Sequence, residues 1–140
     1  MKKMEVHFTC PHCRGQLKVG DQIIFRAKNN KGEYGLVLLH PLIGNYTSIK
    51  HPGFEFREGD ALDFYCPLCH HSLSTDFEEN LAFVVMIDET GVESDIYFSR
   101  IVGEKSTYKV KGDTVTATGE DSGKYTYFRM SDKFKRFLKH

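Results

Sequence analysis

Two matching Cys-Pro-x-Cys frames constrain this chain more than any other feature of its sequence. They read Cys10-Pro11-His12-Cys13 and Cys66-Pro67-Leu68-Cys69, and they contain every cysteine of the chain. A tight turn lets both sulfurs of a pair face one ion, and the proline presets φ for that turn. Two such pairs provide the four thiolates of a tetrahedral metal site, for which zinc is the usual ion. We therefore predict one structural Zn²⁺ ion bound by Cys10, Cys13, Cys66 and Cys69.

Such an ion would tie together two distant parts of the chain. The 52 residues 14–65 separate the two pairs, and closing so long a loop restricts the unfolded chain considerably. The predicted role of the metal is therefore to hold two hairpins together.

Three other chemistries use the same four residues. Four cysteines in two such turns also hold the iron of a redox-active electron carrier of the rubredoxin kind. Cys-Pro-His-Cys is also the tetrapeptide of strongly oxidising thioredoxin-fold proteins, in which the first cysteine begins a helix. Residues 16–21, which follow the first pair here, have no helical period. Structural disulfides are the last alternative, and they are rare in the reducing compartment that we expect for this chain.

Three of the seven histidines lie at the cysteine pairs. His12 lies inside the first pair, and His70 and His71 directly follow the second. Four cysteines leave no vacant position for an imidazole ligand, so we expect these rings to donate hydrogen bonds to thiolates or to face solvent. Three further histidines have no partner at ligand spacing and are treated as ordinary residues: His40, His51 and His140.

Short runs of β-branched and aromatic residues, separated by turn signals, dominate the rest of the chain. Strands are predicted at residues 6–9, 22–28, 33–40, 61–65, 81–88, 95–102, 107–111, 114–118 and 124–129. Each cysteine pair then lies at the tip of a strand. The predicted fold is mostly β, with two Cys-x-x-Cys knuckles packed on an antiparallel sheet that forms a sandwich or a barrel.

The last ten residues have a different pattern. Ser131 is a helix cap, and Phe134, Phe137 and Leu138 follow at helical spacing among basic residues. We expect a short C-terminal basic helix over 131–140 that packs its apolar side on the sheet, because so short a helix is marginal unless it packs. The alternative is that this helix docks on a membrane surface, an RNA or a protein partner.

Composition and motifs argue against several classes of function. Nineteen Lys and Arg balance nineteen Asp and Glu, so no overall field draws the chain to nucleic acid or anionic membranes. No apolar run approaches the roughly 20 residues of a membrane span, and no secretory signal is recognisable, so we expect a cytoplasmic protein. Neither a glycine-rich phosphate loop nor a Gly-x-Ser-x-Gly elbow occurs, which favours a binding protein over an enzyme.

Two regions are candidates for contacts with other molecules. Four lysines could cluster on one face and bind nucleic acid, but acidic residues are interspersed among them, which favours a protein partner: Lys105, Lys109, Lys111 and Lys124. The irregular segment 42–53 either lines a pocket or is a long crossover between strands.

The double Cys-Pro-x-Cys frame in a small, strand-rich chain resembles the zinc-ribbon superfamily. More narrowly, it is similar to the uncharacterised bacterial domain described by its two Cys-Pro-x-Cys motifs. The resemblance implies metal ligation by the four cysteines and implies no particular biochemical role, because ribbons serve many functions. We expect residues 1–140 to form a single domain, with a zinc-ribbon half (1–75), an antiparallel β half (81–130) and the C-terminal helix (131–140).

Overall fold

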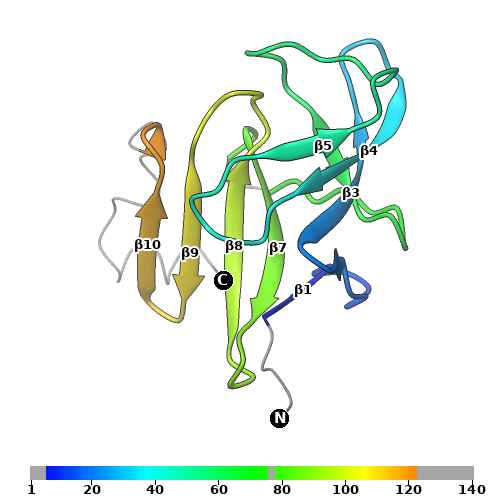
Figure 1. Cartoon of the computed structure of the whole chain (residues 1–140). Coiled ribbons are helices and arrows are strands. Elements are labelled where there is room, and N and C mark those ends of the chain that lie inside the picture. The colour runs from blue at the N-terminus through cyan, green and yellow to red at the C-terminus, as the bar shows by residue number, and fades with distance from the viewer. Residues whose placement is uncertain (1–5, 76–77, 123–140) are drawn as a thin grey trace.

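A computed structural model describes residues 6–75 and 78–122, and within these residues it has ten strands and no helix. The strands form two antiparallel sheets, which confirms the predicted mostly β fold (Figure 1). Among the same residues, no helix has the length and apolar character needed to cross a membrane. The strands are β1 (His7–Thr9), β2 (Lys18–Val19), β3 (Gln22–Lys28), β4 (Tyr34–Leu39), β5 (Ser48–Lys50), β6 (Asp63–Tyr65), β7 (Leu81–Ile87), β8 (Glu93–Ser99), β9 (Thr107–Lys111) and β10 (Thr114–Thr118).

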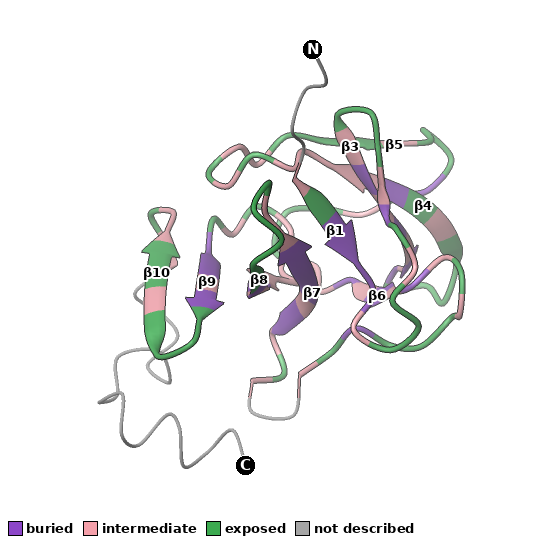
Figure 2. Ribbon diagram, turned by 90° about the horizontal axis from the view of Figure 1, so that it is seen from below, coloured by how far each residue is buried: buried purple, intermediate pink, exposed green. Residues whose placement is uncertain are grey.

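The first sheet has the strand order β1-β7-β8-β9-β10. Its strand β7 comes from the most apolar run of the sequence, and five of its seven residues are buried. The turn from β7 to β8 is held by Asp88, whose Oδ1 accepts hydrogen bonds from the amides of Thr90 at 2.9 Å and Val92 at 3.0 Å. Figure 2 shows that β7 and β9 are largely buried, whereas β10, the edge strand, has no buried residue.

The second sheet has the order β2-β3-β4-β5, and β6 also pairs with β3. Every second residue of β3 is buried, as expected of a strand with one face in the core. Asn29 shapes the turn from β3 to β4, because its Oδ1 accepts the amides of Lys31 and Glu33, both at 3.0 Å. Its Nδ2 donates to the carbonyl of Glu55 at 2.9 Å, which fixes the following loop to the same turn.

The main hydrophobic core contains residues of both sheets. Phe25 of β3 and Phe64 of β6 belong to this core, and Phe98 of β8 packs against it. The three rings contact one another, with centroids 5.2–5.4 Å apart. Their edge-on and tilted arrangement is the favourable one for aromatic pairs. These three rings therefore join the sheets through direct contact. A second, smaller core cluster is formed by Leu81, Tyr97, Tyr108 and Val110.

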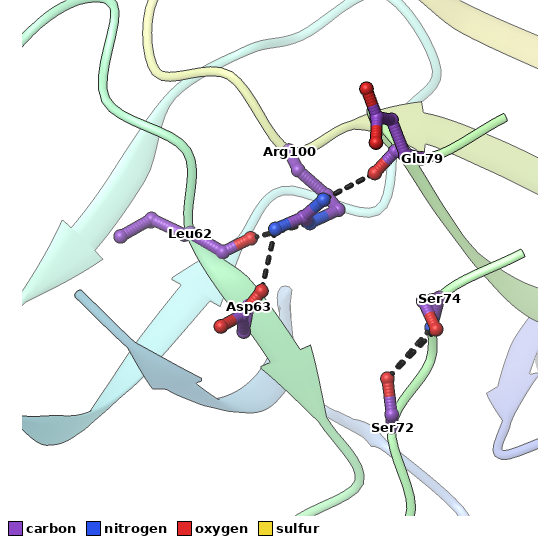
Figure 3. Close-up of polar contacts among 6 residues, drawn as sticks. All are labelled: Leu62, Asp63, Ser72, Ser74, Glu79 and Arg100. Carbon is purple, nitrogen blue, oxygen red and sulfur yellow. Dashed lines mark hydrogen bonds and ion pairs between the residues drawn. The ribbon is translucent and has the colours of Figure 1, made fainter. Parts of the chain in front are cut away.

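Arg100, which directly follows β8, forms a polar link between the sheets (Figure 3). Its Nε donates to the carbonyl of Leu62 at 2.9 Å, and its Nη2 lies 2.5 Å from Oδ1 of Asp63 on β6. Its Nη1 also donates to the carbonyl of Glu79. The Arg100 side chain is only 16% exposed, so its guanidinium depends on these acceptors to replace water.

The structure differs from the sequence predictions chiefly at its shortest strands. β2 and β5, of two and three residues, are not predicted, since strands this short show no periodic pattern. They form because the longer β3 and β4 offer them backbone partners. The predicted strand 124–129 and the predicted helix 131–140 lie outside the described residues.

Candidate metal centre

The two cysteine knuckles extend from strands of different sheets. β1 of the first sheet leads into Cys10, and β6 of the second leads into Cys66. Each knuckle returns to its own strand through a single bridge, Thr9 with Gln16 in the first and Tyr65 with Ser72 in the second. The prediction that each knuckle lies at the tip of a strand is therefore confirmed.

The knuckles have the same backbone structure. In each, the carbonyl of the first cysteine accepts the amide four residues later at 2.9 Å, that of Arg14 from Cys10 and that of His70 from Cys66. Arg14 and His70 both have left-handed backbones, with φ of 63° and 66°. Glycine commonly takes this conformation because it lacks a Cβ, yet neither knuckle uses one at this position.

The four sulfurs lie at the spacing of a tetrahedral metal site. Cys10 Sγ is 3.7 Å from Cys69 Sγ, and Cys13 Sγ is 3.7 Å from Cys66 Sγ. All four ligand atoms lie within 4.8 Å of one another. A regular tetrahedron with metal–sulfur bonds of about 2.3 Å has edges of about 3.8 Å, so the cluster needs little adjustment to accept an ion. The four cysteines are free in this structure.

Backbone amides point at the sulfurs. Cys10 Sγ accepts the amides of His12 at 3.3 Å and Cys13 at 3.5 Å. Cys66 Sγ accepts the corresponding amides, of Leu68 at 3.3 Å and Cys69 at 3.4 Å. Such N–H groups partly offset the negative charge of thiolates, and four thiolates around one ion need that compensation.

Burial divides the cysteines into two inner and two outer ones. Cys10 and Cys66 are fully buried, whereas Cys13 is exposed and Cys69 is partly exposed. Burial raises the pKa of the Cys10 thiol to about 12 and also raises the pKa of Cys66. The amide of His71 lowers the pKa of Cys69 to about 6. The inner thiols thus need a nearby cation to ionise, and a bound metal would supply it.

The histidines near the cysteines lie outside the ligand group, which contains only cysteines. All three are exposed. The rings of His12 and His71 stack across the two knuckles with centroids 4.7 Å apart, and His12 Nε2 donates to the carbonyl of Ser72 at 3.2 Å. The His71 side chain also helps to lower the pKa of the Cys69 thiol, which agrees with the predicted role of donor to a thiolate.

Two contacts that the sequence does not predict hold the first knuckle in place. A Cβ added at Gly15 would lie 2.5 Å from Cδ1 of Leu68 and 3.3 Å from Cys13 Sγ, so Gly15 lets the two knuckles approach closely. Arg14 forms an ion pair with Glu93 at the start of β8. Neither contact has a local signal in the sequence, because the partners are far apart along the chain.

The remaining histidines serve local turns. His40 Nδ1 accepts the amide of Leu42 at 3.1 Å, and His51 Nδ1 accepts the amide of Gly53 at 2.9 Å. These contacts agree with their treatment as ordinary residues. His140 lies outside the described residues.

Comparison of the chain with models of known protein families, with curated proteins and with solved structures found no match. The expected resemblance to zinc ribbons therefore rests on the two Cys-Pro-x-Cys frames alone. Within the described residues, these four cysteines form the one group of three or more ligand side chains spaced to hold a metal ion.

Proposed function

We propose that this protein binds one Zn²⁺ ion through Cys10, Cys13, Cys66 and Cys69, and that the ion is structural. The observation that carries the proposal is the convergence of four free sulfurs within 4.8 Å of one another. Zinc is the usual ion for four thiolates. Four protein ligands also complete a tetrahedral shell, whereas catalytic zinc keeps a position open for water or substrate. The donor set therefore favours a structural role over a catalytic one.

The structural role follows from where the two knuckles come from. One belongs to β1 at the edge of the first sheet and the other to β6 of the second. Both strands are only three residues long, so their own pairing provides few hydrogen bonds. An ion between them would fasten the two sheets to each other. On this basis we propose that residues 1–140 fold as a single domain in the reducing environment of the cytoplasm.

Metal content and colour of the purified full-length protein test this proposal. We expect one equivalent of zinc and no visible absorption. Replacing zinc by Co²⁺ should give the intense visible bands of a tetrahedral four-sulfur site. Iron with visible absorption would instead support a rubredoxin-like electron carrier, and a metal-free protein with paired cysteines would support thiol–disulfide chemistry. Either result contradicts the zinc proposal.

A docking surface for a protein partner is our second proposal, and the outer face of the second sheet favours it. Tyr34, Leu36 and Ile49 lie on this face and are 50%, 53% and 53% exposed. Exposed apolar side chains gathered on one sheet face are typical of protein contacts. The guanidinium of Arg26 lies 3.9 Å from the centre of the Tyr34 ring. This cation therefore already has a partner within the protein and is less available to a nucleic acid.

Titration with labelled single-stranded RNA and DNA separates a protein partner from a nucleic acid. We expect no saturable binding at physiological salt, because the chain carries no net charge. Saturable binding that weakens steeply with salt, and that is lost in Arg26→Ala, would contradict the assignment to a protein partner.

A further inference from the structure

A cavity of about 220 Å³ lies between the two sheets, apart from the cysteine cluster. Its inner walls are apolar and come from both sheets, with Val37 of β4 on one side and Val84 and Ile96 of β7 and β8 on the other. All three side chains are buried. Protein interiors are packed as closely as organic crystals, and few voids in them exceed a water molecule. A space of this size therefore calls for an explanation.

The mouth of the cavity is formed by two irregular segments. Residues 40–48, which lead from β4 into the first residue of β5, and residues 99–107, which lead from the last residue of β8 to the first of β9, line it. The sequence left two interpretations of residues 42–53 open, a pocket lining and a crossover between strands. In the structure, residues 42–48 of this segment line the cavity. Figure 1 shows the connection from β4 to β5 reaching across to the first sheet.

Tyr46 fixes this mouth. Its hydroxyl donates to the carbonyl of Thr118 at 3.0 Å and lies 3.0 Å from Oγ1 of Thr107. The segment thus comes from the second sheet and is anchored on β9 and β10 of the first. The cavity wall is held by specific hydrogen bonds, as a preformed binding site requires.

Most polar groups at the mouth are already paired within the protein, but the buried hydroxyl of Ser106, which also lines the cavity, has no hydrogen-bond partner. Asn45 Oδ1 accepts the amide and hydroxyl of Thr47 at 3.1 and 2.7 Å. Ser99 donates to Glu104 at 2.7 Å, and Arg100 is satisfied by its contacts with β6 and Glu79. No uncompensated charge therefore faces the cavity from these groups. Lys105 also lines the cavity, but it is exposed and its ammonium group can keep its water. An occupant of the inner cavity would therefore be held mainly by apolar contact, with the Ser106 hydroxyl as one polar partner.

The volume sets the size of the occupant. An apolar cavity of about 150 Å³ takes up benzene and stays free of water. The additional space here admits roughly two or three further carbon atoms. It is smaller than the roughly 300 Å³ at which sites for drug-sized ligands begin.

From these observations we infer that the cavity is a binding site for a small, neutral, mostly apolar molecule of the size of an alkyl-substituted benzene. Apolar side chains of both sheets hold its body, and the segment 40–48 closes over it. None of the four cysteines of the proposed metal centre lines this site.

Titration of the methyl-labelled, full-length protein with alkylbenzenes, followed by NMR, tests the inference. Saturable shifts are expected at the methyl groups of Val37, Val84 and Ile96. The affinity should rise about fourfold for each CH₂ group added to benzene, as far as ethyl or propyl, and should stop rising at hexyl. Absence of saturable shifts at these methyl groups, or an affinity that keeps rising through hexylbenzene, would overturn the inference.

Two matched variants locate the site. Val102 lines the mouth and contacts the main core, so Val102→Phe should weaken ethylbenzene binding at least tenfold. Val92 is 38% exposed and does not line the cavity, so Val92→Phe should leave binding unchanged. If Val102→Phe fails to fold, Ile43→Phe fills the mouth from the other segment. Equal binding by a folded mouth variant would place the ligand elsewhere.

A charged probe tests the neutral character of the ligand. 4-Ethyltoluene and 4-ethylbenzoate differ little in size, but burying the carboxylate among apolar walls is costly. We expect the benzoate to bind at least tenfold more weakly. Equal or tighter binding of the benzoate would overturn the assignment to neutral molecules.

Discussion

Replacement of Cys13 by serine separates a metal-binding cluster from four cysteines that are merely close together. Cys13 is exposed, and surface substitutions away from special features usually change the free energy of unfolding by less than about 0.5 kcal/mol. Without a metal, Cys13→Ser should therefore be nearly silent. With a metal, it removes one of four ligands and should release the ion despite its exposure.

The expected loss can be worked from the loop that the ion closes. Fifty-two residues separate Cys13 from Cys66. A single cross-link around a loop of that length lowers the entropy of the unfolded chain by about 14 cal/mol/K, which is about 4 kcal/mol at 25 °C. Unfolding entropy near 60 °C is about 2.1 cal/mol/K per residue, or about 0.29 kcal/mol/K for 140 residues. Loss of the cross-link should thus lower Tm by about 14 °C.

Calorimetry under reducing conditions, combined with metal analysis of the same samples, measures both effects. Cys66→Ser should behave like Cys13→Ser even though Cys66 is buried and Cys13 is exposed. His70→Gly is the matched control, since glycine keeps the left-handed backbone of this position and removes a side chain that is no ligand. It should retain the metal and melt within about 2 °C of the wild type.

A strong chelator provides the internal check. It should lower the Tm of the wild type to that of Cys13→Ser and leave the variant unchanged. If Cys13→Ser keeps its metal and melts with the wild type, Cys13 is not a ligand and the proposed site is wrong. If His70→Gly releases the metal, the ligand set has to include that histidine.

Three further predictions concern the scaffold, each measured by urea unfolding. Arg100→Met should lower the free energy of unfolding by about 2–3 kcal/mol, because it leaves backbone carbonyls without their charged donor. Asp63→Asn should lower it by less than about 1 kcal/mol, because the Asp63 side chain is 46% exposed. Equal losses in the two variants would contradict this reasoning. Gly119→Ala should cost at least about 2 kcal/mol, since its φ is +103° and its Cβ would lie 2.1 Å from the carbonyl oxygen of Lys105. Gly20 has a φ of +59° and open space where a Cβ would lie, so Gly20→Ala should lower the free energy of unfolding by only about 1 kcal/mol. A larger loss for Gly20→Ala than for Gly119→Ala would refute the steric reason. The hydroxyl of Thr90 and the amide of Val92 lower the pKa of Asp88, so its contribution is present above pH about 4 and disappears as the pH falls through the lowered pKa. Asp88→Asn should therefore lose less stability than the wild type between pH 6 and pH 3, and an unchanged loss would contradict this.

The local structure of this chain is largely readable from its sequence. β3, β9 and β10 have the predicted bounds. Their bounds are predictable because the alternation of apolar and polar residues and the turn residues that end each strand are local features of the sequence. The cysteine cluster follows for a similar reason. Each Cys-Pro-x-Cys turn is a local structure, and two of them present four sulfurs whose common target is one ion.

Long-range pairing is what the sequence leaves undetermined. β1 pairs with β7 through His7 and Ile87, and Arg100 finds Asp63 across 37 positions of the chain. No periodic pattern in the sequence predicts either contact. The sequence therefore predicts two knuckles at strand tips, but not that the tips belong to opposite sheets, nor that a cavity remains between those sheets.

The two knuckles come from different sheets, and this arrangement connects the cysteine cluster with the cavity. Phe8 lies two residues before Cys10, and Phe64 lies two residues before Cys66. Alternate residues of a strand point to the same face. The strand that positions each cysteine therefore also determines where its phenylalanine lies. Both rings line the cavity. An ion that holds Cys10 and Cys66 together would therefore also hold these two walls in place. By thermodynamic linkage, a ligand that binds better between fixed walls must in turn strengthen the binding of the metal.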